Sequence, residues 1–184
     1  MFKHLRSSPI TYSQYFIAKR HLGQELIQHI PPHILRDAHV IEIGPGKGRL
    51  TEFLASRANK LTAIEVDYNF WKRLREQYRG HKNVRVLCGD FLDFVLPNEP
   101  YAIVSNLPFF LSRMMILRAL KASRRPVALY VIIQHELRTE LEGLVRQYAF
   151  DITVLRTMKR ADYEPMPRVE SEYVVIIPHT KKHL

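Results

Sequence analysis

The chain has 184 residues and a mass of 21.7 kDa, which is the size of one domain. Hydrophobic residues make up 46% of it and charged residues 25%, a balance that excludes a disordered or collagen-like chain. Lys and Arg number 28 against 18 Asp and Glu, and this net charge of +10 favours a polyanionic partner, usually nucleic acid. A domain that is basic without such a partner is the alternative.

The sequence carries no sign of a membrane segment, a secretory signal or a cysteine framework. No apolar run approaches the roughly 20 residues of a membrane helix, and residues 1–6 lack the apolar core of a secretory signal. Cys88 is the only cysteine, which excludes an internal disulfide and a cysteine zinc site. Trp71 and the nine histidines show no metal-ligand spacing. We therefore expect a cytoplasmic monomer that uses neither a membrane nor a metal.

Short β-branched runs alternate with helical patterns along most of the chain. In chain order, the predicted elements are helix 16–30, strand 40–43, helix 50–57, strand 61–66, helix 69–78, strand 84–87, strand 101–104, helix 114–122, strand 127–133, helix 135–148, strand 152–155 and strand 173–177. The last two strands are joined through a proline-bearing loop, which favours a hairpin.

This alternation predicts an α/β fold with a mostly parallel seven-stranded sheet, an antiparallel C-terminal edge, and helices on both faces. We expect one domain over residues 1–184, with a helical N-terminal segment (1–38) before a sheet core (39–178). The amphipathic helix over 16–30 is expected to pack on the sheet or on a ligand.

A glycine loop with the pattern Gly-x-Gly-x-Gly, from Gly44 to Gly48, follows a predicted strand and opens a helix. Glycines let the backbone turn tightly and let a ligand approach the amides at a helix start. Glu65, 21 residues after Gly44 at the tip of the next strand, is suited to accept both hydroxyls of a ribose. Together they predict a nucleoside-bearing cofactor at the carboxyl ends of the strands. For the loop alone, a structural turn is the alternative.

A third strand ends in Gly89-Asp90-Phe91. A short acid there can accept a hydrogen bond from an adenine amino group, with Phe91 against the face of the ring. A plain turn is the alternative, since Gly-Asp is common in turns.

The fourth strand closes on Asn106-Leu107-Pro108-Phe109. An exocyclic amine on a base is a poor nucleophile, because its lone pair is delocalised into the ring. The Asn106 side-chain oxygen and the Leu107 carbonyl are suited to accept its two N–H groups, with Pro108 stiffening the turn and Phe109 stacking on the base. The amine would then face a methyl sulfonium, and positioning would supply most of the rate. A strand-ending turn is the alternative.

Taken together, the motifs resemble the Erm and KsgA group of rRNA adenine-N(6) methyltransferases. Residues 11–21 are similar to the group's N-terminal Ser-Gln-Asn-Phe-Leu motif, and the glycine loop, residues 63–67, Gly89-Asp90 and the Asn106 tetrapeptide follow in the group's order. Residues 163–171 resemble its Phe-x-Pro-x-Pro-x-Val-x-Ser signature. The likeness spans residues 11–178, nearly the whole chain.

The resemblance implies a Rossmann-like class I methyltransferase fold, S-adenosylmethionine as cofactor and adenine in ribosomal RNA as substrate. The residues that it implies for cofactor binding are Gln14, Tyr15, Ile17, Gly44, Gly46, Glu65, Val66, Asp90, Phe91 and Asn106. Gln14, Tyr15 and Ile17 would close over the methionine end of the cofactor. Asn106 would touch both the cofactor and the target amine, and Phe109 and Tyr163 would stack on the everted base.

The chain departs from the group's pattern in three places. Tyr15 stands where the group usually has Asn, and Phe109 replaces the commoner Tyr. Members usually continue into a small helical domain that helps to bind RNA, and we expect this chain to lack that domain.

Basic residues follow the catalytic tetrapeptide, and no acidic residue lies between 110 and 135. Arg118, Lys121 and Arg125 are predicted to share one helical face by i, i+3, i+4 spacing. With Arg113 they are expected to hold RNA phosphates beside the target base, and a solvated helix face is the alternative.

Gly-Lys-Gly in the glycine loop and Ala-Lys-Arg-His at residues 18–21 resemble the Erm branch more than KsgA. We therefore expect methylation of an adenine in 23S rRNA, with resistance to macrolide-type antibiotics. The alternatives are a KsgA-type enzyme that acts on 16S rRNA and a non-catalytic nucleic-acid-binding protein on the same scaffold.

Overall fold

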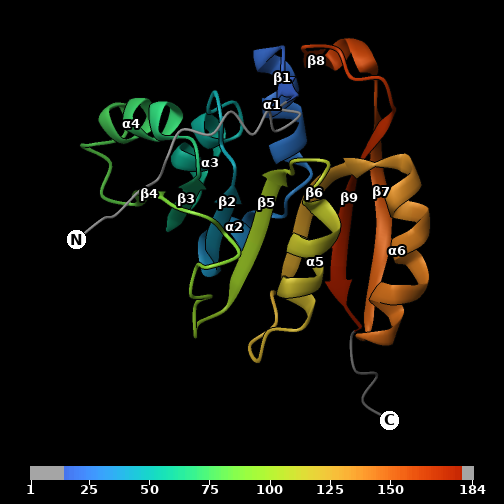
Figure 1. The fold of residues 1–184 in the computed structure, drawn as a ribbon. Coiled ribbons are helices and arrows are strands. Elements are labelled where there is room, and N and C mark those ends of the chain that lie inside the picture. Colours follow the sequence, from blue (N-terminus) through green and yellow to red (C-terminus); the bar gives the residue numbers. More distant parts are fainter. Residues whose placement is uncertain (1–14, 180–184) are drawn as a thin grey trace.

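A seven-stranded sheet forms the centre of the computed structural model, which describes residues 15–179 (Figure 1). Its strands are β2 (His39–Ile43), β3 (Leu61–Glu65), β4 (Val84–Cys88), β5 (Tyr101–Asn106), β6 (Ala128–Gln134), β7 (Phe150–Met158) and β9 (Ser171–Pro178). The spatial order is β4-β3-β2-β5-β6-β9-β7, and the first five strands are parallel. β9 runs antiparallel to both β6 and β7. The predicted parallel sheet with an antiparallel C-terminal edge is confirmed.

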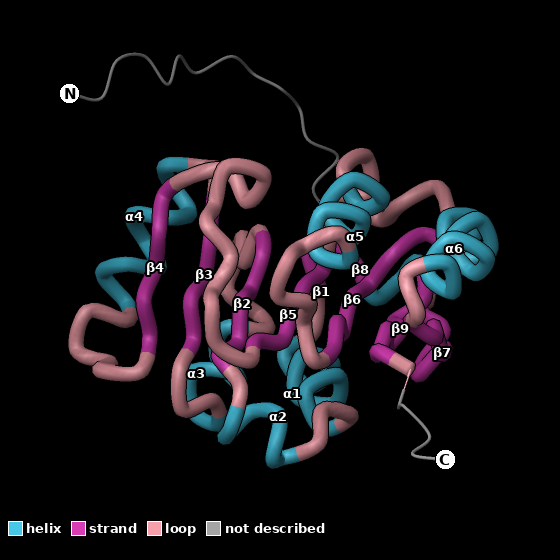
Figure 2. Tube along the Cα trace, turned by 90° about the horizontal axis from the view of Figure 1, so that it is seen from below, coloured by secondary structure: helices cyan, strands magenta, loops and turns pink. Residues whose placement is uncertain are grey.

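Helices cover both faces of this sheet, as the fold prediction required (Figure 2). They are α1 (Arg20–Gln28), α2 (Pro32–Asp37), α3 (Thr51–Arg57), α4 (Tyr68–Gln77), α5 (Ser112–Leu120) and α6 (His135–Gln147), with a short 3-10 turn at Arg160–Asp162. Figure 2 shows α1, α2 and α3 on one face and α5 and α6 on the other. No helix within residues 15–179 is both long enough and apolar enough to span a bilayer.

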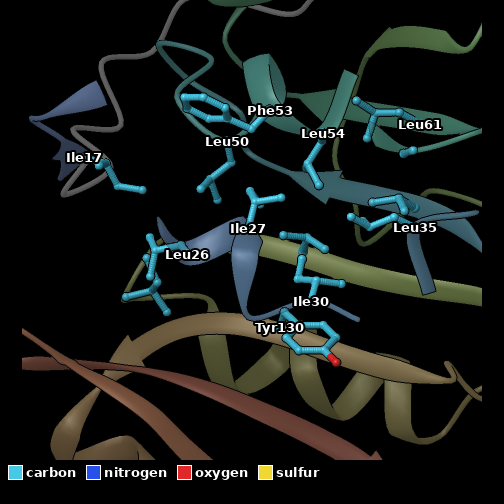
Figure 3. Close-up of a cluster of buried hydrophobic side chains, with 14 of the residues drawn as sticks. Ile17, Leu26, Ile27, Ile30, Leu35, Leu50, Phe53, Leu54, Leu61 and Tyr130 are labelled. Carbon is cyan, nitrogen blue, oxygen red and sulfur yellow. The ribbon is translucent and has the colours of Figure 1, made fainter. Parts of the chain in front are cut away.

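Two apolar clusters lie on opposite faces of the sheet, because successive side chains of a strand point to opposite faces. Val40 of β2 joins the cluster under α1 and α3, whereas its neighbour Ile41 joins the cluster under α5 and α6. Leu26 of α1, Leu54 of α3 and Tyr130 of β6 belong to the first cluster (Figure 3). Burying a side chain of this size contributes about 1.5–3 kcal/mol. The clusters hold the parallel strands in register, so their carboxyl ends meet at one edge.

The N-terminal segment differs from its prediction. Residues 16–17, expected to begin a helix, form strand β1 (Phe16–Ile17), which pairs antiparallel with β8 (Tyr163–Glu164). The Ala18 amide then donates to the Asp162 carbonyl at 2.8 Å, and helix α1 begins only at Arg20. The pairing partner is distant in sequence, so it overrides the local helical pattern.

Other boundaries shift by a few residues. The helix predicted over 114–122 is α5, which begins at Ser112 and ends at Leu120. The strand predicted over 152–155 is the longer β7, and its pairing with β9 confirms the predicted hairpin. The division into segment 1–38 and core 39–178 stays a prediction.

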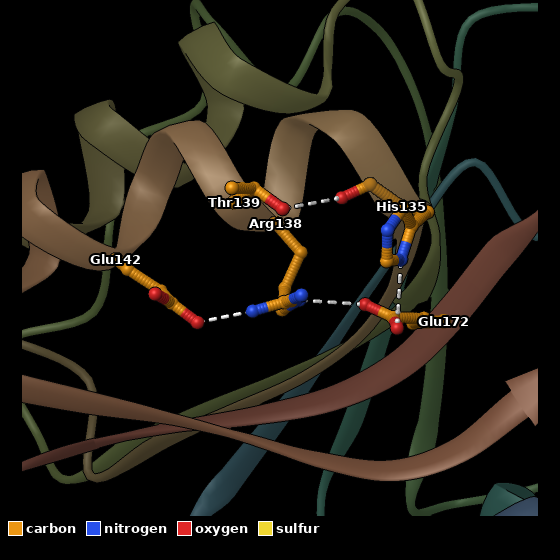
Figure 4. Close-up of polar contacts among 5 residues, drawn as sticks. All are labelled: His135, Arg138, Thr139, Glu142 and Glu172. Carbon is orange, nitrogen blue, oxygen red and sulfur yellow. Dashed lines mark hydrogen bonds and ion pairs between the residues drawn. The ribbon is translucent and has the colours of Figure 1, made fainter.

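A polar cluster fastens α6 to β9 (Figure 4). Glu172 of β9, only 7% exposed, accepts hydrogen bonds from Arg138 Nε at 2.8 Å and pairs with His135 Nδ1 at 3.0 Å. Arg138 also pairs with Glu142 one turn further along the helix. The cluster satisfies a buried carboxylate and fixes α6 next to β9.

Candidate active site at the carboxyl ends of the strands

A cleft opens where β2, β3, β4 and β5 end. Its walls come from the N-terminal segment, the glycine loop, the tips of β3 and β4, and the loop after β5. The lining residues are Tyr15, Phe16, Ile43, Gly44, Gly46, Ile64, Glu65, Val66, Gly89, Asp90, Phe91, Asn106, Leu107, Pro108, Phe109, Leu111 and Met115. In open parallel sheets this edge is where ligands bind.

The glycine loop lies at the floor of the cleft. Gly44 has φ +61°, and a Cβ there would have only Pro108 Cγ near it, at 4.0 Å, so the backbone is open toward the cleft. Gly46 has φ +53°, and a Cβ there would lie 2.6 Å from the ring of Phe16. Both positions require glycine for the left-handed backbone, and Gly46 also requires it for the close approach of Phe16.

Glu65 links the glycine loop to the tip of β3. Its Oε2 accepts from the Gly46 amide at 2.8 Å and its Oε1 from the Asp67 amide at 2.9 Å. The side chain is 2% exposed, and burial raises the pKa of its carboxyl while these two amides oppose the rise. Each oxygen keeps a second lone pair for a ligand. Asp67 has a different task, because its carboxylate caps α4 at the amides of Asn69 and Phe70.

The tip of β4 supplies the next wall. The Gly89 amide donates to the Glu65 carbonyl at 3.0 Å, which keeps the two strand tips aligned. Asp90 Oδ1 accepts from the Leu92 amide at 2.8 Å. The Phe91 ring is 2% exposed and lines the cleft, with the Arg118 guanidinium 4.8 Å from its centroid. An acceptor and an apolar wall thus lie together, as the sequence predicts.

Asn106 has its amide orientation fixed by the N-terminal segment. Its Nδ2 donates to the Tyr15 carbonyl at 2.7 Å, while its Oδ1 is buried and accepts no hydrogen bond within residues 15–179. The Leu107 carbonyl likewise accepts none from that part of the chain. The Pro108 carbonyl is held by the Leu111 amide and the Ser112 hydroxyl, both at 2.9 Å. The loop is therefore anchored at the start of α5, and two oxygen acceptors remain free.

Phe109 forms an aromatic wall of the cleft with Tyr15. Their ring centroids are 5.2 Å apart and the rings are inclined by 43°. Tyr15 contributes a backbone carbonyl to Asn106 and a ring to Phe109. A planar base has two aromatic surfaces against which to pack.

Two predicted site residues, Ile17 and Tyr163, do not line the cleft. Ile17 lines a smaller neighbouring cavity, and Gln14 lies outside the described residues. Tyr163 is 4% exposed, does not line the cleft, and hydrogen-bonds through its hydroxyl to Ser171. Tyr163 is thus buried in β8 and away from the cleft lining, and stacking of its ring on the base stays a prediction.

The predicted basic residues do not share one helical face, because α5 ends at Leu120, before Lys121 and Arg125. Arg118 folds back to donate to the Phe94 carbonyl, and its guanidinium covers Phe91. Arg125 lies beyond the end of α5 and donates to the Tyr148 carbonyl at 2.7 Å. Both guanidinium groups therefore have partners within the protein.

Arg113 and Lys121 are exposed at opposite ends of α5. Arg113 lies in the first turn, directly after the Asn106 loop. Lys121 caps the far end, near the segment where the Arg124 carbonyl accepts from the Tyr101 hydroxyl at the start of β5. Of the predicted basic group, only Arg113 lies at the cleft end of the helix, and phosphate binding by it stays a prediction.

A second, smaller cavity adjoins the cleft and was not predicted. It is lined by Phe16, Ile17, Glu42, Gly44, Pro45, Lys47, Arg49, Leu50 and Asn106. Glu42 is 1% exposed and its Oε2 has no hydrogen-bond partner among the described residues. Burial raises the pKa of this carboxyl to about 8, and the nearby Glu65 carboxylate adds to the rise. The sequence feature that could have indicated this cavity is Glu42, a charged residue within the apolar strand Val40–Ile43.

The cleft fits the nucleoside cofactor that the sequence predicts. Glu65 and Asp90 offer acceptors at successive strand tips, Phe91 offers an apolar wall, and Gly44 leaves room at the loop. Within the described residues 15–179, no three His, Cys, Asp or Glu side chains gather as metal ligands would.

This sheet, with its glycine loop and Asn-Leu-Pro-Phe tip, defines a Rossmann-like methyltransferase. The crystal structure of 23S rRNA methyltransferase ErmE superposes with a TM-score of 0.80 at 27% identity, over 92% of this chain and 72% of that one. The sequence profile of the ribosomal RNA adenine dimethylases matches residues 6–183, and the chain belongs to that family. The predicted fold class and family are confirmed.

Two curated relatives extend the comparison. The rRNA adenine N-6-methyltransferase of Limosilactobacillus reuteri is 30% identical over 92% of this chain and 71% of its own length. The ribosomal RNA small subunit methyltransferase A of Levilactobacillus brevis is 29% identical over 94% of this chain and 68% of its own length.

Proposed function

We propose that the protein transfers a methyl group from S-adenosylmethionine to the exocyclic amine of an adenine in ribosomal RNA. The observation that carries this proposal is Asn106, which lines the cleft and commits its Nδ2 to Tyr15, while its buried Oδ1 accepts no hydrogen bond from residues 15–179. When bound, S-adenosylmethionine supplies an electrophilic methyl group on a sulfonium. The family and the relatives named above support the activity and the RNA substrate.

The residues of the protein position the amine and localise its lone pair on the nitrogen. Asn106 Oδ1 and the Leu107 carbonyl accept its two N–H groups, which draws the lone pair out of the plane of the ring. These oxygens are fixed before the substrate arrives, so little reorganisation accompanies the reaction. No strong base is needed at the amine, because its proton becomes acidic once the new bond forms.

The target base must leave a helix or be unpaired already, because the amine cannot reach the cleft floor from within a stacked duplex. Phe109 and Tyr15 would then replace the lost stacking. A loop or bulge in folded RNA is the favoured substrate. Arg113 and the net charge of +10 support phosphate binding around the cleft.

For the identity of the RNA, we propose 23S rRNA, with macrolide-type resistance as its consequence in a bacterial cytoplasm. The similarity to ErmE and the Erm-like glycine loop support it. A 16S rRNA substrate is the second candidate, because several relatives are named small subunit methyltransferase A.

The test is methyl transfer from tritiated S-adenosylmethionine to naked 16S and 23S rRNA, followed by mass-spectrometric mapping of the modified adenines. We expect label in one RNA at one or a few adenines, and none with Asn106→Ala. Asn98→Ala, at an exposed asparagine before β5, is the matched control and should keep full activity. Full activity of Asn106→Ala would refute the assigned role.

A further inference from the structure

Helix α4 carries exposed aromatic and basic side chains next to the cleft, and the proposed reaction does not use them. The helix follows the tip of β3, and its first residue, Tyr68, comes two positions after Val66 of the cleft wall. Figure 1 shows α4 at the outer end of the sheet, beside β4. An RNA strand whose target base enters the cleft can therefore continue across this helix.

Four of these side chains lie on one face of α4. At the i, i+3, i+4, i+7 spacing of a single helical face, they are Tyr68, Trp71, Lys72 and Arg75. Tyr68 is 59% exposed, Lys72 and Arg75 are also exposed, and Trp71 is half-buried. The helix packs on the core through Leu74, which is fully buried. The four-residue face is therefore turned toward solvent.

The aromatic rings and one guanidinium of this face form a stack. The ring centroids of Tyr68 and Trp71 are 5.2 Å apart, and the Arg75 guanidinium lies 5.2 Å from the Trp71 centroid. Trp71 is anchored, because its Nε1 donates to the Val86 carbonyl of β4 at 3.4 Å. Aromatic rings and arginine planes of this kind are the groups on which unstacked RNA bases pack.

The charge around the stack is almost entirely positive. Between residues 68 and 89, Glu76 is the only acidic residue, and it pairs with Arg79 at 3.7 Å. Lys72 and Arg75 make no ion pair within residues 15–179. Cations beside an exposed aromatic stack match a partner that offers both phosphates and bases. An acidic protein would match the charge but would leave the stack unused.

We propose that this face of α4 binds the RNA strand next to the target adenine, with an unpaired base on Tyr68 and phosphates at Lys72 and Arg75. RNA as the partner rests on the proposed function, whereas the choice of α4 rests on the stack and its cations. This contact lies outside the cleft, so it contributes to RNA affinity and leaves the chemical step unchanged.

The first experiment measures the affinity for naked 16S and 23S rRNA with S-adenosylhomocysteine present, between about 50 and 200 mM KCl. Lys72→Gln with Arg75→Gln should weaken binding. It should also reduce the slope of log K against log salt by about 1.4, because each phosphate contact of an unpaired strand contributes about 0.7. For the rRNA that accepts methyl groups, KM should rise while kcat is retained.

The matched control is Arg57→Gln with Arg146→Gln, which removes the same charge. Arg57 lies in the last turn of α3 and Arg146 in the last turn of α6, and both are exposed. Each of these helices begins near the strand tips and therefore ends at the opposite edge of the sheet, away from the cleft. The control should keep the affinity and the salt slope of the unaltered protein.

The second experiment uses Trp71, the only tryptophan in the chain, whose fluorescence reports on this face. We expect rRNA to quench the Trp71 emission as it binds. Tyr68→Ala should weaken rRNA binding by roughly 5- to 100-fold, and Tyr68→Phe, which keeps the ring, should bind like the unaltered protein. The affinity for S-adenosylhomocysteine should be the same in all variants, which also reports that they are folded.

The inference is wrong if the two double variants lose equal affinity, since only net charge would then matter, or if rRNA binds without changing the Trp71 emission. It is also wrong if neither double variant loses affinity, and an acidic protein would then be the better partner for this face. In these cases the proposed function stands. If rRNA binds with the expected losses but accepts no methyl group, the inference holds and the proposed function fails. If the unaltered protein binds neither rRNA, both fail.

Discussion

Asn106 at the tip of β5 donates its Nδ2 proton to the backbone carbonyl of Tyr15, 91 residues earlier, at 2.7 Å. This one bond fixes the orientation of the Asn106 amide. The N-terminal segment therefore orients the group proposed to bind the target amine, and β1 holds that segment in place by pairing with β8.

Asn106→Asp tests this orientation. A carboxylate cannot donate to the Tyr15 carbonyl, so it would be repelled from that position and would misplace the acceptor. We expect methyl transfer to fall at least 100-fold, roughly the loss of one well-placed polar contact in a transition state. The dissociation constant for S-adenosylhomocysteine should rise only a few-fold. Asn98→Asp is the control, and equal losses in the two variants would contradict the role of the amide.

Gly46→Ala tests the glycine loop. The new methyl would meet the Phe16 ring at 2.6 Å, and the backbone would be strained at φ +53°. We expect a loss of about 1–3 kcal/mol in the free energy of unfolding and weaker binding of S-adenosylhomocysteine. Gly80→Ala, where nothing lies within 4 Å, is the control. In the double variant with Phe16→Ala the clash should disappear and the φ strain remain, so urea unfolding should show partial recovery.

Phe109→Ala should lower kcat/KM for rRNA by roughly 10- to 100-fold, because stacking one base on an aromatic ring contributes about 1–3 kcal/mol. Phe109→Tyr keeps the ring and should retain most activity. The affinity for S-adenosylhomocysteine should change little in both variants. An alanine variant as active as the tyrosine variant would show that the base does not stack there.

Glu42→Gln should change stability in a pH-dependent way. The pKa of the Glu42 carboxyl is raised from 4.5 to about 8 in the fold, so its contribution to stability is fully present below pH 4.5 and is lost as pH rises toward 8. Gln does not ionise, and the variant should therefore gain stability over the unaltered protein across this range. The upper limit is about 1.4 kcal/mol per pH unit. Urea unfolding at pH 5, 6.5 and 8 without ligand measures it, and a constant difference would contradict it.

Much of the fold follows from local patterns. The alternation of β-branched runs and helices predicts the sheet, and each cofactor motif falls at the end of a strand, so Gly44, Glu65, Asp90 and Asn106 meet for a topological reason. What the sequence could not predict depends on contacts between distant residues. Phe16 belongs to a strand because Glu164 lies opposite it.

The positions of two side chains depend on distant contacts in the same way. Tyr163 has a motif that suggests base stacking, yet its hydroxyl is bound to Ser171 in the interior. Arg118 has the spacing of a phosphate-binding face, yet its guanidinium donates a hydrogen bond to the Phe94 carbonyl. A helical wheel shows which side a residue is on, but not which carbonyl lies within its reach.

The position of β9 between β6 and β7 has a consequence for synthesis. Residues 171–178 form hydrogen bonds with both neighbouring strands. β7 therefore has no strand to pair with until residues 171–178 have been synthesised. A nascent chain paused before residue 171 would carry a five-stranded half-sheet and an unattached ribbon. We therefore expect protease resistance to arise late, only once residues 171–178 pair with both of their neighbours.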